Sequence, residues 1–285
     1  MTSERNIWKN QSYESIVEDF YGKGVENYGD YHGGYLNFGL WENGNTNYII
    51  AAENLVATLA RSIDIDKKSK ILDVACGLAA QDVYMHALFH CTIDAVDVTW
   101  KHVALGRKRV ERAGYSKNVR IHHGTATKLN FPDDTFTHVM GIEGPAHFDT
   151  REDFFREAFR VLKPRGIIGL SDYILNRKPR NIIEQFFLEA ACKLWHAPRE
   201  NRDTAETYSL KLKRSGFVNI TIKKIGRNVI PGYYFENKRD ETIQAMKKIR
   251  GYFIAHAGRI IDYVMYKVFL IGVIEYVLVR AEKPK

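Results

Sequence analysis

Two acidic residues, Asp73 and Asp97, occur in short apolar segments of the sequence, 70–75 and 92–98. They are about two dozen positions apart, close to the roughly 20-residue interval at which a carboxylate reaches the ribose hydroxyls in βαβ nucleotide-binding folds. A carboxylate can accept hydrogen bonds from both of these hydroxyl groups. The spacing therefore predicts a nucleotide site in which Asp97 binds the ribose.

The stretch from Ile71 to Gln81 predicts the turn that holds this nucleotide. Its apolar start is typical of a buried strand, Gly77 permits a sharp backbone turn, and residues 81–89 have helical composition. A strand, a turn of small residues and a helix N-terminus together form a nucleotide pocket.

Strands and helices alternate through most of the chain. Apolar periodicity predicts helices at 46–62, 81–89, 100–113, 151–162, 181–196 and 205–215, and strands at 70–75, 92–98, 119–123, 136–142, 167–172, 216–223 and 276–280. This order predicts an α/β, Rossmann-like fold: a mostly parallel sheet with helices on both faces and ligands at the carboxyl ends of its strands.

We expect a single domain over residues 1–285, because no repeat or low-complexity linker divides the chain. Residues 1–65 are predicted to form a helical and aromatic lid segment, 66–180 the nucleotide-binding core, and 181–285 a C-terminal part with a lid insertion at 231–265 and closing strands. The glycines and rings of residues 12–44 favour a loop that folds over a ligand; the alternative is a surface loop pinned to the core by its own rings.

The composition argues against several classes of protein. Three scattered cysteines indicate neither a disulfide framework nor a metal site, and the N-terminus lacks the pattern of a signal peptide, so we expect a cytoplasmic protein without a metal. The apolar segment 263–279 contains Lys267 and Glu275, which argues against membrane insertion. The net charge of +8 is spread along the chain, which favours a solvated basic surface over a nucleic-acid partner.

Motifs spread over nearly the whole chain resemble those of one enzyme family. They are Leu72–Gly77, Val96–Val98, Phe131–Phe136, Glu143–Phe148 and Phe159–Gly166. In this order they resemble class I S-adenosylmethionine-dependent methyltransferases, in particular the small-molecule branch that includes tocopherol, sarcosine/dimethylglycine and macrolide methyltransferases. The resemblance implies a seven-stranded sheet whose last strand, at 272–280, is antiparallel. It also implies S-adenosylmethionine as cofactor, S-adenosylhomocysteine as product, and a small, fairly hydrophobic acceptor.

Two features depart from the family pattern. The family usually has glycine where this chain has Ala75, Ala79 and Ala80, and alanine is small enough that we still expect binding. The family often has an acid near Thr125 that contacts the adenine amine, and a threonine offers only its hydroxyl oxygen as acceptor.

The resemblance and the predicted strand ends together give a set of ligand-binding residues. Those expected to bind the cofactor are Asp73, Ala75, Gly77, Gln81, Asp97, Val98, Thr125, Ala126, Ile142, Glu143 and Tyr21. Those expected to bind the acceptor are Tyr28, Trp41, Tyr233 and Tyr234. Each ring has an alternative role in simply packing the core.

Three residues are candidates for the chemistry. A hydroxyl acceptor needs its proton removed, and His147, which resembles a histidine used by related O-methyltransferases, is the candidate base. Asp172 is expected to orient or assist it, and Glu143 to hold the methionine amino group or stabilise a cation during C-methylation. Each residue has an alternative role: His147 packs structurally, Asp172 caps the following segment, and Glu143 is a surface acid.

Other functions compete with this hypothesis. A nicotinamide-dependent oxidoreductase also uses an acid such as Asp97, but residues 77–82 lack the Gly-x-Gly-x-x-Gly pattern. A non-catalytic protein that binds S-adenosylmethionine and an RNA methyltransferase are further alternatives. The sequence leaves open the acceptor, the methylated atom (O, N or C) and the oligomeric state, with a homo-oligomer allowed.

Overall fold

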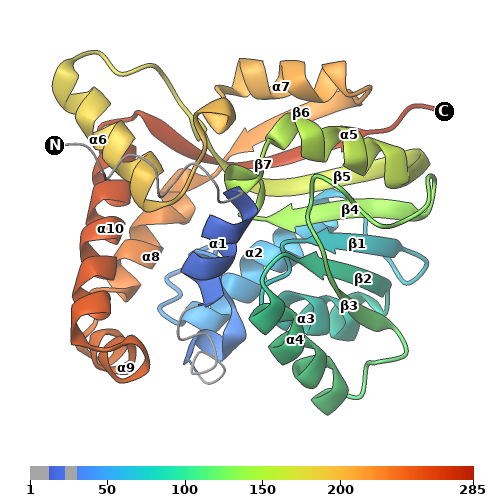
Figure 1. Cartoon of the computed structure of the whole chain (residues 1–285), viewed down its shortest axis with the longest axis horizontal. Helices are drawn as coiled ribbons and strands as arrows, with labels where there is room; N and C mark the ends of the chain where they lie inside the picture. Colours follow the sequence, from blue (N-terminus) through green and yellow to red (C-terminus); the bar gives the residue numbers. More distant parts are fainter. Residues whose placement is uncertain (1–12, 23–30) are drawn as a thin grey trace, which may run out of the picture.

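The computed structural model describes residues 13–22 and 31–285. They form a seven-stranded sheet in the order β3-β2-β1-β4-β5-β7-β6. In Figure 1 the strands lie side by side, from β6 at the top to β3 at the bottom. Its first strands, β1 (Lys70–Val74), β2 (Thr92–Asp97), β3 (Val119–His123) and β4 (Phe136–Ile142), pair in parallel.

The last strand closes the sheet in the opposite direction. β7 (Ile274–Glu282) runs antiparallel to both β5 (Leu162–Leu175) and β6 (Val218–Lys224). This confirms the predicted seven-stranded, mostly parallel fold. The prediction was wrong about the bounds of the fifth strand: it was expected at 167–172, and β5 begins at Leu162 and ends at Leu175, with Arg165 at a φ of 66° near its start.

The helices of the core begin and end close to their predicted positions. They are α2 (Tyr48–Ser62), α3 (Ala80–Phe89), α4 (Trp100–Arg112), α5 (Arg151–Val161), α6 (Ile182–Leu194) and α7 (Ala205–Arg214). Side-chain caps fix several starts: Asn47 accepts from the Ile50 N–H, and Thr150 and Asp153 form a capping box.

Two apolar clusters cover the sheet. One includes buried residues of α2, α3, α4, α6 and α10 (Tyr252–Leu270), and the other includes those of α5 and α7. Strand residues such as Ile71 and Leu72 are fully buried between them, as expected for a parallel sheet covered on both faces.

Six further elements contribute to the region beside the carboxyl ends of the strands. They are α1 (Tyr13–Gly22), the 3-10 turns η2 (Tyr31–Gly34) and η3 (Pro145–His147), α8 (Ile230–Glu236), α9 (Asp240–Arg250) and α10. In Figure 1, α8, α9 and α10 stand at the left, with α1 between them and the strands. None of the helices in the described ranges combines the length and apolar character that a membrane span requires.

Candidate active site

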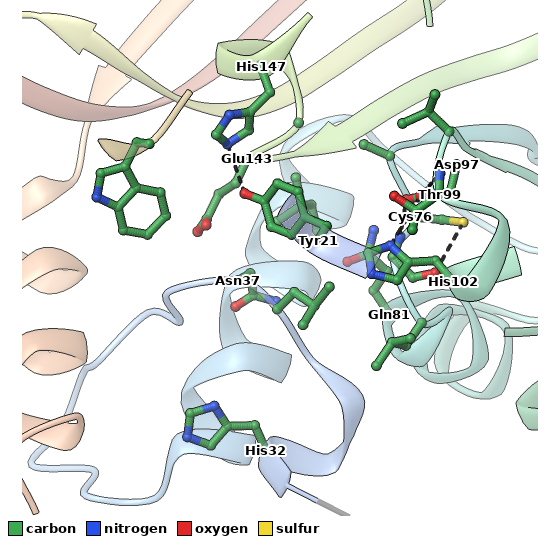
Figure 2. Close-up of a pocket in the computed structure, with 18 of the residues that line it drawn as sticks. Tyr21, His32, Asn37, Cys76, Gln81, Asp97, Thr99, His102, Glu143 and His147 are labelled. Carbon is green, nitrogen blue, oxygen red and sulfur yellow. Dashed lines mark hydrogen bonds and ion pairs between the residues drawn. The ribbon is translucent and has the colours of Figure 1, made fainter. Parts of the chain in front are cut away.

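A cavity of about 420 Å³ lies where the strand ends meet α1 and the helices α8 to α10. Its size falls within the roughly 300–1,000 Å³ of small-molecule sites. Figure 2 shows part of its wall, with residues from α1, the segment before α2, the loops after β1 and β2, and the loop after β4.

The loop after β1 has an unusual backbone. Ala75, Gly77 and Ala79 have φ values of 62°, 57° and 58°, in the left-handed region that favours glycine. A Cβ atom on Gly77 would lie 2.9 Å from Leu36 Cδ1, so a side chain there would displace Leu36. Ala75 and Ala79, two of the three alanines at the family's glycine positions, therefore keep a glycine-like conformation, and the turn remains tight; Ala80 begins α3.

Asp97 fixes the other side of this loop. Its carboxylate accepts from the Gly77 N–H at 2.9 Å and the Thr99 N–H at 2.8 Å, and contacts His102 Nδ1 at 3.1 Å. Asp97 lines the cavity, so its carboxylate is placed to accept further hydrogen bonds from ligand hydroxyls.

Asp73 lies one layer behind the wall. It is fully buried and does not line the cavity, which corrects the expected direct contact with the cofactor. Its carboxylate accepts from Gln81 Nε2 at 2.5 Å, and Gln81 does line the cavity. Burial raises the pKa of Asp73 to about 7, because a charged carboxylate loses its water there, and it raises the pKa of the neighbouring Asp82 well above its usual range. Asp73 thus positions Gln81.

The other predicted cofactor residues all line the cavity. Val98 follows β2, Thr125 and Ala126 follow β3, and Ile142 ends β4. The Thr125 hydroxyl lies 3.1 Å from that of Thr127, which also lines the cavity and was not predicted.

His147 and Tyr21 form a contact inside the cavity (Figure 2). The Tyr21 hydroxyl lies 3.1 Å from His147 Nε2, and His147 Nδ1 lies 3.4 Å from the His196 carbonyl oxygen. Because a carbonyl only accepts, Nδ1 carries the proton of the neutral ring and Nε2 is the acceptor, here toward the Tyr21 hydroxyl. Burial lowers the pKa of His147 to about 4, so the ring is neutral at pH 7.

Asp172 does not orient His147, contrary to expectation. It is fully buried and outside the cavity wall, where Arg151 Nε and Nη2 donate to its two oxygens at 2.8 and 3.0 Å. The Tyr208 hydroxyl also donates to it, at 3.1 Å. A buried guanidinium at the start of α5 needs a paired carboxylate, and Asp172 serves that ion pair.

Glu143 joins three parts of the fold at the cavity wall. Its Oε1 accepts from the Phe38 N–H at 2.7 Å and the Tyr276 hydroxyl at 2.8 Å, and its Oε2 accepts from the Tyr173 hydroxyl at 2.8 Å. Burial raises its pKa to about 7. It is buried, so the surface role considered for it is wrong.

The four rings predicted for the acceptor separate in the structure. Tyr233 lines the cavity and stacks on Phe38 with ring centroids 3.9 Å apart. Trp41 lies outside the wall, where Nε1 donates to the Phe38 carbonyl at 2.8 Å, and Tyr234 stacks instead on Tyr266 at 4.2 Å. These two rings pack against other aromatic residues instead, and Tyr28 lies outside the described residues.

Several wall residues were missed by the sequence reasoning. Asn37 is 3% exposed; its Oδ1 accepts from the Gly39 N–H at 2.9 Å, which leaves Nδ2 as a donor without a partner. His102 contacts Asp97, and Trp195 packs against Phe38. For Asn37 and His102, the only sequence signal is that each lies close to a predicted motif. Further wall residues between α8 and the end of α10 include Asn237, Thr242, Ile243, Met246, Gly258, Arg259, Ile261 and Asp262.

The wall fits the nucleotide and sulfonium expected from the motifs. The tight Ala75–Ala79 turn allows close approach of a ligand, Asp97 presents acceptors for ribose hydroxyls, and the ring of Tyr21 offers a face to a cation. Within the described ranges, no group of His, Cys, Asp and Glu side chains has the arrangement of a metal site.

Comparison with known sequences points to one kind of domain. A family model described as a methyltransferase domain matches residues 71–166. The chain is 29% identical over 263 residues to the erythromycin 3''-O-methyltransferase of Saccharopolyspora erythraea, a match that covers 88% of this chain and 84% of that protein. It is 26% identical over 165 residues to the 27-O-demethylrifamycin SV methyltransferase of Amycolatopsis mediterranei, covering 56% of this chain and 61% of that protein.

Solved structures share the fold over almost the whole chain. The geranyl diphosphate C-methyltransferase of Streptomyces coelicolor A3(2) superposes with a TM-score of 0.76 at 14% identity, covering 96% of this chain and 98% of that one. The [4+2]-cyclase SpnF superposes with a TM-score of 0.75 at 20% identity, covering 96% and 97%. These two names describe different reactions, so the fold alone does not specify the chemistry.

Proposed function

We propose, on the premise that the chain is an S-adenosylmethionine-dependent methyltransferase, that it methylates a hydroxyl group of a small, largely apolar acceptor. The matched domain and the methyltransferase relatives carry the premise, and they support neither a nicotinamide oxidoreductase nor a non-catalytic binding protein. The acceptor and the methylated atom are our inference from the cavity.

The residues around the first turn would hold the cofactor. Asp97 accepts hydrogen bonds from the ribose, and the Ala75–Ala79 turn admits the ligand close to the backbone. Tyr21 places its ring beside His102 and His147, where the face of a ring attracts a cation by about 0.5 to 2 kcal/mol. The bound cofactor supplies a methyl group attached to a positively charged sulfur.

One observation favours oxygen as the methylated atom: the neutral His147 presents Nε2 to the cavity. A hydroxyl oxygen that forms a bond to carbon must lose its proton, and Nε2 of a neutral imidazole accepts it. The low pKa set by burial keeps this nitrogen unprotonated before the reaction. The Tyr21 hydroxyl, at 3.1 Å from Nε2, illustrates that this nitrogen can accept from a hydroxyl group.

The rest of the wall favours an acceptor with apolar surface. Trp195, Tyr233, Ile243, Met246 and Ile261 supply apolar area around the polar groups, a composition typical of small-molecule pockets. One relative is named an erythromycin 3''-O-methyltransferase and another a 27-O-demethylrifamycin SV methyltransferase, and the first name is consistent with hydroxyl chemistry.

A product assay tests the proposal. The purified chain is incubated with methyl-labelled S-adenosylmethionine and pairs of apolar acceptors that differ only in bearing a hydroxyl or its methyl ether. We expect label in the ether formed from the free hydroxyl and stoichiometric release of S-adenosylhomocysteine. Label found only on nitrogen or carbon atoms, across a panel that includes amines and alkenes, would contradict the proposal.

A further inference from the structure

The cavity has a second polar region, at the end formed by the lid helices. Asp262 of α10 lines it, and Asn237, which follows α8, lies beside it. The neighbouring wall residues Ile243, Met246 and Ile261 are apolar. Asp262 is the only carboxylate that residues 230–270 contribute to the cavity wall as described.

The Asp262 carboxylate has one protein partner. Its Oδ2 accepts from Asn237 Nδ2 at 2.9 Å, and no ion pair in the described ranges includes it. Arg259 lies one turn earlier on α10 and also lines the cavity, but it forms no ion pair with Asp262. Burial raises the pKa of Asp262 to about 7, since its charge has little compensation.

The hydrogen bond also fixes the orientation of the Asn237 amide. Because Nδ2 donates to Asp262, the Asn237 Oδ1 is left as an acceptor on the same wall. A carboxylate oxygen and an amide oxygen therefore stand together, and both accept hydrogen bonds.

A purely structural link between α8 and α10 does not need a carboxylate. An amide or hydroxyl at position 262 would accept from Asn237 equally well, without the cost of a poorly compensated charge among apolar residues. An acidic residue is useful at this place if a positive group of a ligand pairs with it.

Resting on the proposed function, we propose that Asp262 and Asn237 form a recognition subsite for a protonated amine of the acceptor, separate from the hydroxyl that is methylated beside His147. The acceptor is then an apolar molecule with two polar groups, a hydroxyl nucleophile and a basic nitrogen. The amine pairs with the carboxylate and donates to the Asn237 amide oxygen, which anchors the acceptor by its far end.

The test uses heptylamine and heptan-1-ol as probes of equal chain length, with the enzyme saturated by S-adenosylhomocysteine. Calorimetry at pH 7.5 measures the affinity of each probe for the native chain, for Asp262→Asn and for Asn237→Ala. Asp240→Asn removes a nearby exposed carboxylate outside the cavity and serves as the matched control. Thermal unfolding of each variant establishes that it is folded.

The native chain and Asp240→Asn should bind the amine at least about tenfold more tightly than the alcohol. Asp262→Asn should remove this preference, and Asn237→Ala should reduce it several-fold. Equal affinities in the native chain, or a preference that survives Asp262→Asn, would overturn the proposal. The proposed function fails separately, because it requires S-adenosylhomocysteine binding and methyl transfer, which are measured without either probe.

Discussion

The two halves of the cavity are built from different parts of the chain. The half that we propose to bind the cofactor, called the cofactor half below, comes from consecutive strand ends and their loops, residues 74–99 and 124–127. The half that we propose to bind the acceptor, called the acceptor half, comes from segments far apart in sequence: residues 32–37, η3, Trp195 and the helices α8 to α10. Tyr21 of α1 lies between the two halves, beside His102 and His147. The first half is therefore fixed by the sheet, while the second depends on how distant segments pack over it.

The polar groups of the two halves are held differently. In the cofactor half, Asp97 accepts from backbone N–H groups of its own loops, so its position follows from the sheet. In the acceptor half, Glu143 joins the segment before α2 to β5 and β7, and His147 contacts α1 and the His196 carbonyl. Substitutions in the first half should change cofactor affinity, and those in the second should change turnover or acceptor affinity.

His147 gives the largest expected effect. His147→Asn should lower kcat by about 10²- to 10⁴-fold, the usual contribution of a general base, and leave S-adenosylhomocysteine affinity within about twofold. Because the pKa of His147 is lowered to about 4, native activity should not titrate with this ring between pH 6 and 8 and should fall below about pH 5.

Steady-state kinetics and calorimetry measure the two quantities. His90→Asn is the matched control, because His90 is an exposed left-handed residue after α3, a conformation that asparagine tolerates. A His147 variant that loses cofactor affinity and keeps kcat would contradict the assignment of His147 to the acceptor half.

Asp172→Asn tests whether Asp172 stabilises the fold or takes part in catalysis. The substitution removes the charge that pairs with the buried Arg151, so it should lower the free energy of unfolding by about 3 to 5 kcal/mol and leave kcat of the folded enzyme within about twofold. Urea unfolding and active-site titration measure these quantities. Asp64→Asn removes the exposed partner of Arg280 and should cost less than about 1 kcal/mol. A large loss of kcat at unchanged stability would show that Asp172 acts in catalysis, as first expected.

The sequence predicted the sheet well, and it also located wall residues near the first turn, because both depend on local patterns. Apolar runs of strand length, a glycine turn and an acid at the second strand end are short-range signals, and they located Gly77, Gln81 and Asp97 on the cavity wall. The error at Asp73 has a physical reason: alternate strand residues face opposite ways, and spacing alone does not tell a wall residue from its support.

The acceptor half was predicted only as a region. Rings at 233 and 234 are neighbours in sequence, yet one lines the cavity and the other packs on Tyr266, since adjacent positions on a helix point in different directions. Asn37, Asn237 and Asp262 carried no motif. Their roles arise from the packing of segments that only the folded structure brings together.

Gly77→Val probes the cofactor half directly. Valine at a φ of 57° is strained, and its Cβ would meet Leu36 at 2.9 Å, so S-adenosylhomocysteine affinity should fall at least about 100-fold. Gly114→Val is the matched control: Gly114 has a φ of 76°, but a Cβ there meets nothing within 4 Å. The control should lose some stability and keep its affinity. Equal affinities for the two variants, measured by calorimetry, would show that the turn does not hold the cofactor.

The smallest expected effect is on stability, and it comes from the carboxylate of Asp262 in the acceptor half. Burial raises the pKa of Asp262 from 3.8 to about 7, so the folded state binds a proton more tightly than the unfolded state. Stability from this group is complete below about pH 4 and is lost as pH rises through about 7. Asp262→Asn removes this loss and should be more stable than the native chain by at least about 1 kcal/mol at pH 8, with little difference at pH 4, since each pKa unit corresponds to about 1.4 kcal/mol.

Urea unfolding at both pH values measures this difference, and Asp240→Asn, an exposed acid on α9, should follow the native chain at each. Equal free energies of unfolding for the native chain and Asp262→Asn at pH 8 would show that the Asp262 carboxylate does not lower stability in the absence of ligand. If the cost is observed, the acceptor half retains a charge that the fold does not need, and only a ligand of opposite charge compensates it. The cofactor half differs in this respect, because its wall carboxylate, Asp97, is paired by backbone donors before any ligand binds.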